Sequence, residues 1–126
     1  PPLQHSFNFP YQLSGDSQYS DDVDKAQSLT FKVAPGDTVV CGTDGLFDNA
    51  YPEEICRAVV QGAQFKETPE ETSKALADLA FKNATDNSKL SPWAAEARKH
   101  GYFSTGGGKM DDVTVVVSKV IQESAL

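Results

Sequence analysis

The sequence predicts a layered α+β fold, in which helices pack against an antiparallel sheet. Segments with the two-residue period of a β-strand lie near the beginning and at the end of the chain. Segments with helical spacing of apolar residues lie between them. Strands and helices are therefore segregated along the chain, whereas a Rossmann-type fold alternates them.

The first predicted strand covers residues 5–13, where apolar side chains stand at every second position. Pro10 within this run is typical of an edge strand or of a strand with a bulge, because proline has no amide hydrogen to donate. Residues 14–24 are polar, acidic and rich in turn-forming residues, which predicts a flexible loop.

A hairpin is predicted over residues 28–42. Polar and apolar residues alternate over residues 28–33, and residues 38–41 form a short run rich in β-branched side chains. Residues 34–37, with the sequence Ala-Pro-Gly-Asp, predict the turn between these strands, since proline presets the first corner and glycine tolerates a positive φ.

Two helices are predicted in the middle of the chain. Pro52 fits the first turn of a helix whose apolar stripe ends before Gly62. Thr68 and Glu71 form the capping-box pattern, in which each side chain satisfies the other's backbone amide, and the helix that follows extends to about Asn83.

The C-terminal third predicts one more helix and one more strand. Ser91 and Pro92 begin a shorter helix that ends around Gly101. Residues 113–120 are nearly continuous in β-branched side chains and predict the last strand. Three or four strands with one helical layer make a thin arrangement for 126 residues.

Composition excludes several classes of function. The net charge of −7 and the pI near 4.6 argue against a nucleic-acid partner, which would require a basic patch. No apolar stretch is long enough for insertion into a membrane. Cys41 and Cys56 are too few for a disulfide scaffold or a cysteine-rich zinc module, and their apolar neighbours predict buried free thiols of a reducing, intracellular compartment.

Two acidic segments, residues 43–49 and 106–112, adjoin the ends of predicted strands. If those strands are antiparallel, Asp44 and Asp111 lie at the same end of the sheet. Neighbouring carboxylates repel one another unless a cation joins them, and ligand sets made only of oxygen select hard ions such as Mg²⁺ or Mn²⁺. The alternative is that both segments are ordinary loops, because Asp-Gly after a strand and a run of glycines are common turn signals.

These segments, taken in order, resemble a known family. Residues 36–49 (GDTVVCGTDGLFDN) and 107–117 (GGKMDDVTVVV) are similar to the C-terminal half of metal-dependent protein serine/threonine phosphatases of the PPM family, also called type 2C. Residues 4–13 (QHSFNFPYQL) and 91–94 (SPWA) narrow the resemblance to the organellar branch. It covers nearly the whole chain, so residues 1–126 are expected to form the C-terminal portion of a PPM-type catalytic domain.

The resemblance implies both the fold and the metal ligands. The fold would be part of an α-β-β-α layered sandwich. Asp44 would bind the binuclear Mg²⁺/Mn²⁺ centre, Asp111 would be its partner on the second metal, and Asp48 matches a carboxylate that helps to hold a third, weaker metal in some members.

Three further residues support the implied site. Gly45 lets the backbone approach closely, and Thr114 lies in the strand that positions Asp111. Asp112 stands where many family members have asparagine, a difference that the organellar branch tolerates.

The implied reaction is hydrolysis of phosphoserine and phosphothreonine in a phosphoprotein by a metal-bound water. It needs no catalytic residue beyond the metal ligands and no covalent intermediate. The Asp-Gly-x-Gly-Gly metal motif and the phosphate-binding arginine of the family's N-terminal half have no counterpart here. The 126-residue chain is therefore expected to be inactive without that half.

Two questions stay open at this point. The chain could instead be a non-catalytic interaction or regulatory module derived from the phosphatase fold. The organellar resemblance allows a mitochondrial or a plastid location, and the chain contains no targeting segment.

Overall fold

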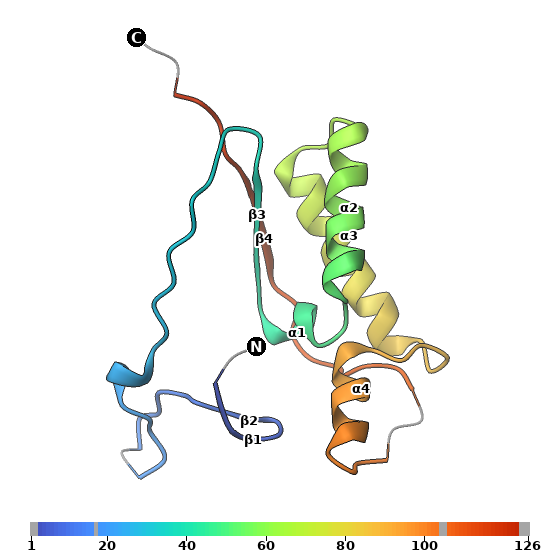
Figure 1. Ribbon diagram of the computed structural model, residues 1–126. Coiled ribbons are helices and arrows are strands. Elements are labelled where there is room, and N and C mark those ends of the chain that lie inside the picture. The colour runs from blue at the N-terminus through green and yellow to red at the C-terminus, as the bar shows by residue number, and fades with distance from the viewer. Residues whose placement is uncertain (1–2, 17, 104–105, 124–126) are drawn as a thin grey trace. The chain divides into compact units, whose positions relative to one another are not determined.

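The computed structural model describes residues 3–16, 18–103 and 106–123 (Figure 1). The chain divides into two compact units, residues 1–32 and residues 33–126. In the described part of the chain, no helix has both the length and the apolar character needed to cross a membrane.

The first unit begins with a small hairpin. Strand β1 (Gln4–Ser6) pairs antiparallel with strand β2 (Phe9–Pro10). The prediction of one strand over residues 5–13 is wrong, because the chain reverses at Asn8, which adopts a φ of 57°. Asparagine tolerates this left-handed conformation better than most residues, and its effect is invisible in the apolar alternation.

Residues 14–24, predicted as a flexible loop, contain turns and the beginning of a short 3₁₀ helix, η1 (Val23–Lys25). Asp21 ties this segment to the strand region, since its carboxylate lies 2.8 Å from His5 Nε2 and accepts a 2.8 Å hydrogen bond from the Gln12 amide. The flexibility of this segment stays a prediction.

In the second unit, strand β3 (Thr38–Gly42) pairs antiparallel with strand β4 (Val115–Lys119). Thr38 lies opposite Lys119 and Gly42 opposite Val115. The predicted last strand is thereby confirmed, within narrower bounds. The ladder continues past the strands, because the Gly36 amide donates to the carbonyl of Val120 at 2.9 Å.

The predicted hairpin over residues 28–42 is wrong. The turn over residues 34–37 does form, with a 3.0 Å hydrogen bond from the Asp37 amide to the Ala34 carbonyl and a φ of 99° at Gly36. However, residues 28–33 form no strand, and β3 pairs with β4 instead. The β-branched run of β4 offers β3 both a full ladder and apolar side chains, which local alternation could not reveal.

Four helices complete the described part of the second unit: α1 (Asp44–Phe47), α2 (Pro52–Gln64), α3 (Pro69–Thr85) and α4 (Pro92–Lys99). The helices predicted from sequence are confirmed as α2, α3 and α4, and only the short α1 was not expected. Helices α2 and α3 pack together, and α3 packs on β4, which makes an α+β arrangement (Figure 1).

The core lies between the helices and one face of the sheet. Its buried apolar members are Leu46, Ala50, Ile55, Leu76, Ala80 and Val117. Leu46 from α1 and Leu76 from α3 are completely buried. Leu46 thus anchors helix α1 in the core, and this fixes the positions of Asp44 and Asp48 on either side of Leu46.

The described residues of this unit leave the opposite face of the β3–β4 sheet uncovered. Val40 and Val117 face the helices, whereas Val39 and Val116 are 40% and 56% exposed. Cys41 alternates with Val40 and is exposed with the outer residues. The expectation of buried thiols is therefore wrong for Cys41, and also for Cys56, which is exposed on α2.

Helix α2 extends past the glycine at which it was expected to end. Gly62 is buried within the helix, where an added Cβ would lie 2.8 Å from Glu67 Oε2 and 2.9 Å from Thr72 Oγ1. The glycine therefore serves close packing of α2 against the start of α3 rather than helix termination.

Replacing Thr68 with alanine is expected to destabilise the protein by about 1 kcal/mol, because it removes the N-cap of α3. The Thr68 hydroxyl accepts a hydrogen bond from the Glu71 amide at 3.2 Å, and Glu71 Oε2 accepts one from the Thr68 amide at 2.8 Å. Urea denaturation measures the change. The matched control is Thr85→Ala at the other end of α3, where the hydroxyl only bonds back to carbonyls of its own helix. An equal effect of both substitutions would contradict the capping role.

Candidate metal centre

One end of the β3–β4 sheet brings the two acidic segments together. Because Gly42 lies opposite Val115, the chain leaving β3 and the chain entering β4 meet at this edge. Asp44 begins α1 directly after β3, and Asp111 lies four residues before β4. The juxtaposition expected from the antiparallel arrangement is present.

Thr43 joins the two segments through three hydrogen bonds. Its hydroxyl donates to the Asp112 carbonyl at 2.9 Å and accepts from the Thr114 amide at 3.0 Å. Its own amide donates to the Thr114 carbonyl at 3.0 Å. Thr114 therefore contributes its backbone here, and Thr43, which sequence reasoning did not single out, holds the loop that carries Asp111.

Gly45 allows this close approach. A Cβ at Gly45 would lie 2.4 Å from the carbonyl oxygen of Asp112, a distance shorter than any real contact of this kind. As expected for a glycine at this position, another segment of backbone comes close to it. That segment is the backbone of Asp112.

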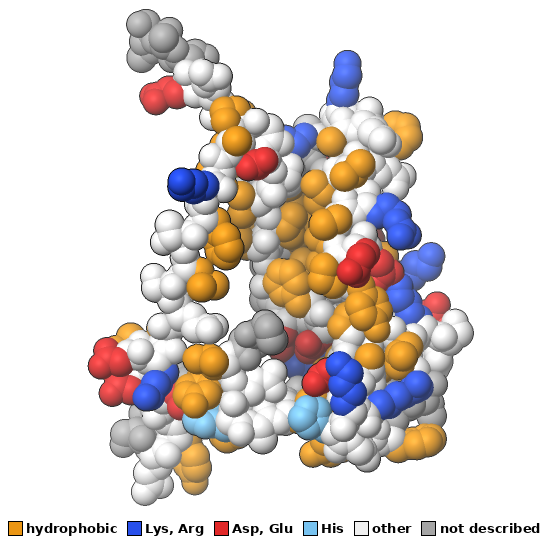
Figure 2. Space-filling view, viewed as in Figure 1, with side chains coloured by type: hydrophobic (Ala, Val, Ile, Leu, Met, Phe, Trp, Pro, Cys, Tyr) orange, Lys and Arg blue, Asp and Glu red, His pale blue; other side chains and the backbone are white. Residues whose placement is uncertain are grey.

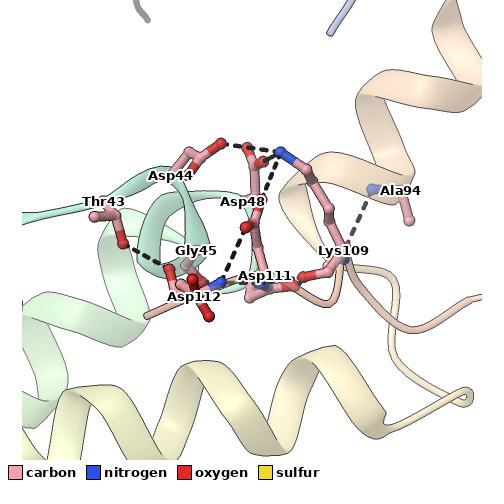
Figure 3. A network of polar contacts seen from close by, with 10 residues as sticks. Thr43, Asp44, Gly45, Asp48, Ala94, Lys109, Asp111 and Asp112 are labelled. Carbon is pink, nitrogen blue, oxygen red and sulfur yellow. Dashed lines mark hydrogen bonds and ion pairs between the residues drawn. The ribbon is translucent and has the colours of Figure 1, made fainter. Parts of the chain in front are cut away.

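The carboxylates of Asp44, Asp48 and Asp111 gather around one ammonium group, that of Lys109 (Figure 3). Lys109 Nζ lies 2.9 Å from Asp44 Oδ2, 2.9 Å from Asp111 Oδ2 and 3.6 Å from Asp48 Oδ2. We call these four residues the carboxylate–lysine cluster. The carboxylate of Asp112 is not among the groups that contact Lys109.

The members of the cluster differ in their exposure to solvent. The Asp44 side chain is 60% exposed, whereas the side chains of Asp48 and Lys109 are 29% and 25% exposed. Burial raises the pKa of Asp48, and its neighbours Asp44 and Asp111 add to that effect, while Lys109 opposes it. The surroundings of Asp48 thus disfavour its charged form.

Hydrogen bonding lowers the pKa of Asp111, whereas the pKa of Asp48 is raised. A hydrogen bond from Lys109, followed by one from the Asp112 amide at 2.9 Å, holds the pKa of Asp111 below its ordinary value. In turn, the hydrogen bonds to Asp111 and Asp44 raise the pKa of Lys109. The ammonium is therefore charged throughout the neutral range, and it neutralises part of the surrounding negative charge.

A buried amide, that of Asn49, positions Lys109. Asn49 Nδ2 donates to the carbonyls of Gly45 and Lys109 at 2.8 and 2.9 Å, and Asn49 Oδ1 accepts from the Lys109 amide at 3.0 Å. The Asn49 carbonyl accepts a 2.9 Å hydrogen bond from Asn83 Nδ2 in α3. The fully buried side chain of Asn49 thereby connects α1 with the loop before β4, and its backbone carbonyl connects this region with α3.

Helix α4 supports the same region from its N-terminus. The Trp93 amide donates a 3.0 Å hydrogen bond to the carbonyl of Asp48. Ser91, which is fully buried, caps the helix by accepting from the Ala94 amide at 3.1 Å. The backbone of Asp48 is held between α1 and α4 as a result.

Besides Thr43, sequence reasoning missed two residues of the candidate site, Lys109 and Asn49. Lys109 stands two positions before Asp111, and the pattern of one lysine among acidic residues was available in the sequence. Asn49 stands in the motif at residues 36–49, but its burial depends on α3, which lies far away in the chain.

The donor types of the cluster fit a hard divalent cation, since three carboxylates contribute only oxygen. Their present arrangement is that of a cluster closed around an ammonium group. Among the described residues, no group of three or more His, Cys, Asp and Glu side chains is arranged so that it could hold a metal ion directly. Binding of a metal would require the carboxylates and Lys109 to rearrange.

Comparison with known proteins identifies relatives along nearly the whole chain. No protein-family model matches. The chain is 43% identical over 120 residues to the Arabidopsis thaliana probable protein phosphatase 2C 55, and 45% identical over 121 residues to probable protein phosphatase 2C 80 from the same plant. Each alignment covers 95% of this chain, but only 25% and 28% of the respective relative.

One solved structure is also similar to this chain. The X-ray structure of the photosystem II phosphatase PBCP superimposes with a TM-score of 0.82 at 36% identity, covering 95% of this chain and 49% of that one. The likeness fits the organellar branch that the sequence resembles. The chain spans about a quarter of the length of the two curated relatives and about half of the solved one. By sequence and by fold, the chain is similar over 95% of its length to members of the protein phosphatase 2C family.

Proposed function

We propose that residues 1–126 form the C-terminal portion of a PPM-type catalytic domain, and that the complete protein is a metal-dependent protein serine/threonine phosphatase. The observation that carries this proposal is the convergence of Asp44, Asp48 and Asp111 at one end of the β3–β4 sheet. The relationship to protein phosphatases 2C along 95% of the chain supports it.

In the complete protein, Asp44 and Asp111 would hold two Mg²⁺ or Mn²⁺ ions, and Asp48 would contribute to a third, weaker site. Bound metal ions of this kind supply a water of lowered pKa and neutralise charge on the transferred phosphoryl group. Thr43 and Gly45 keep the Asp111 loop within reach of α1. No serine or cysteine nucleophile is required, because water attacks phosphorus directly.

The uncovered sheet face supports the view that the domain is completed by further chain. Val39, Cys41 and Val116 are exposed on the side of β3 and β4 that faces away from the helices. Figure 2 shows hydrophobic side chains at the surface over the region of the sheet and α2. A second sheet from the remainder of the protein would bury this face, as sheets do in layered sandwiches.

The proposal is tested by phosphatase assays on the full-length protein with p-nitrophenyl phosphate and a phosphothreonine peptide. We expect Mn²⁺-dependent turnover that falls at least about a hundredfold on chelation with EDTA and returns when Mn²⁺ is restored. The 126-residue chain alone is expected to show no turnover, because the remaining ligands and the phosphate-binding group would be missing.

Two results would contradict parts of this proposal. Activity that survives chelation would exclude the metal-dependent mechanism, and robust turnover by the isolated chain would exclude its incompleteness. If the full-length protein folds, binds no metal and has no activity, the alternative function as a non-catalytic interaction module is favoured.

The names of the relatives, which are protein phosphatases, support a phosphoprotein as the substrate of the complete protein. The structural relative is named for photosystem II, so we propose a plastid as the location of the complete protein, with the mitochondrion as the alternative. Fluorescence microscopy of the full-length protein with a C-terminal fluorescent tag distinguishes the two organelles.

A further inference from the structure

Lys109 is the one positively charged residue of the carboxylate–lysine cluster, and its ammonium group faces three carboxylates. Three carboxylates within 3.6 Å of one ammonium leave the cluster with two uncompensated negative charges. Without that ammonium the three carboxylates would face one another across a small volume. Like charges at such distances destabilise a fold unless a cation lies between them.

The placement of Lys109 is built into the fold. Its backbone amide and carbonyl both bond to the fully buried Asn49 side chain. Gly108 permits this contact, because a Cβ there would lie 1.8 Å from Asn49 Oδ1. The backbone from which the Lys109 side chain extends is thus held by hydrogen bonds to a buried residue.

We propose that Lys109 is the resident cation of the cluster: its ammonium holds Asp44, Asp48 and Asp111 together in the metal-free protein and competes with divalent metal for them. The part of this inference that concerns metal affinity rests on the proposed function. A divalent ion bound to Asp44 and Asp111 carries a charge that repels the ammonium, so the ammonium has to leave the carboxylates as the ion arrives. Lys109 therefore lowers the metal affinity and stabilises the protein without metal.

The experiment uses the full-length protein stripped of metal with EDTA. Lys109→Met removes the charge and keeps the length of the side chain, Lys109→Gln is a second neutral variant, and Lys109→Arg keeps the charge. The matched control is Lys74→Met, which removes the same charge from an exposed pair with Asp78 on α3. The concentration of free Mn²⁺ is measured by electron paramagnetic resonance, and the melting temperature of the metal-free protein is measured by circular dichroism.

We expect Lys109→Met and Lys109→Gln to bind Mn²⁺ at least about tenfold more tightly than the wild type, because a competing charge is gone. Their metal-free melting temperatures should fall by about 3 °C, which Mn²⁺ should restore. Lys109→Arg and Lys74→Met should resemble the wild type in both measurements.

The possible failures are distinguishable. If the wild type binds Mn²⁺ and is active, but the neutral variants bind it no more tightly, the inference about Lys109 is overturned and the proposed function stands. If neither the wild type nor any variant binds Mn²⁺, the proposed function fails together with the claim about affinity. An unchanged metal-free melting temperature in both neutral variants would overturn the role of Lys109 as the resident cation, whatever the metal does.

Discussion

Replacing Asp44 or Asp111 with asparagine in the full-length protein is expected to reduce Mn²⁺-dependent phosphatase activity at least about a hundredfold. Changes to groups that merely orient metal ligands typically cost about ten- to a hundredfold, so loss of a direct carboxylate ligand should cost at least the upper value. Asparagine preserves the size of the side chain but removes its charge. The kinetic constants are measured over a range of Mn²⁺ concentrations.

The control for this prediction is Asp78→Asn. Asp78 is exposed on α3 and pairs only with Lys74 among the ion pairs that the structure describes, so its loss should leave activity unchanged. Circular dichroism of each variant separates loss of a ligand from loss of the fold. Full activity of Asp44→Asn and Asp111→Asn at every Mn²⁺ concentration would show that these carboxylates do not bind the catalytic metals.

Replacing Gly108 with alanine is expected to destabilise the protein by about 3 kcal/mol. The added Cβ would lie 1.8 Å from Asn49 Oδ1, so the Asn49 side chain would have to move, and 3.0 Å from the backbone Cα of Ala84, which leaves little room on that side. Asn49 would be displaced from its hydrogen bonds to Gly45 and Lys109. Overpacking costs about 1–3 kcal/mol, and a buried polar group without its partner adds about 1–3 kcal/mol.

Urea denaturation of the full-length protein measures this effect as a lower midpoint with an unchanged slope. The matched control is Gly15→Ala, because a Cβ at Gly15 meets no atom within 4 Å and the substitution should change stability by less than about 0.5 kcal/mol. Equal stability of the Gly108→Ala variant and the wild type would contradict the tight contact between Gly108 and Asn49.

The helices could be predicted well because their signals are local. The capping box at Thr68 and Glu71 and the proline in the first turn of α2 act within a few residues of one another. The pairing of β3 could not be predicted in this way. Its partner β4 lies more than seventy residues later, and the alternation over residues 28–33 offered a nearer but wrong partner.

The sequence predicted that Asp44 and Asp111 lie close together, and the structure places both beside Lys109, which the sequence did not indicate. Their role as metal ligands stays a prediction. Asp44 and Asp111 could be paired because both stand beside a strand, and antiparallel pairing follows from two strands alone. The involvement of Lys109 depends on Asn49, and Asn49 is held by Asn83 of α3. A contact that requires three elements to pack together has no signature within any one of them.

The sequence by itself determined that the chain is α+β, that it resembles PPM-type phosphatases and that carboxylates stand at two strand ends. These properties follow from short-range periodicity, capping and motif order. Only the tertiary structure decided that β3 pairs with β4, that Cys41 and Cys56 are exposed and that Lys109 lies among the aspartates. The physical reason is that strand partners, the buried side of an element and the neutralisation of charge are all set by contacts between residues far apart in the chain.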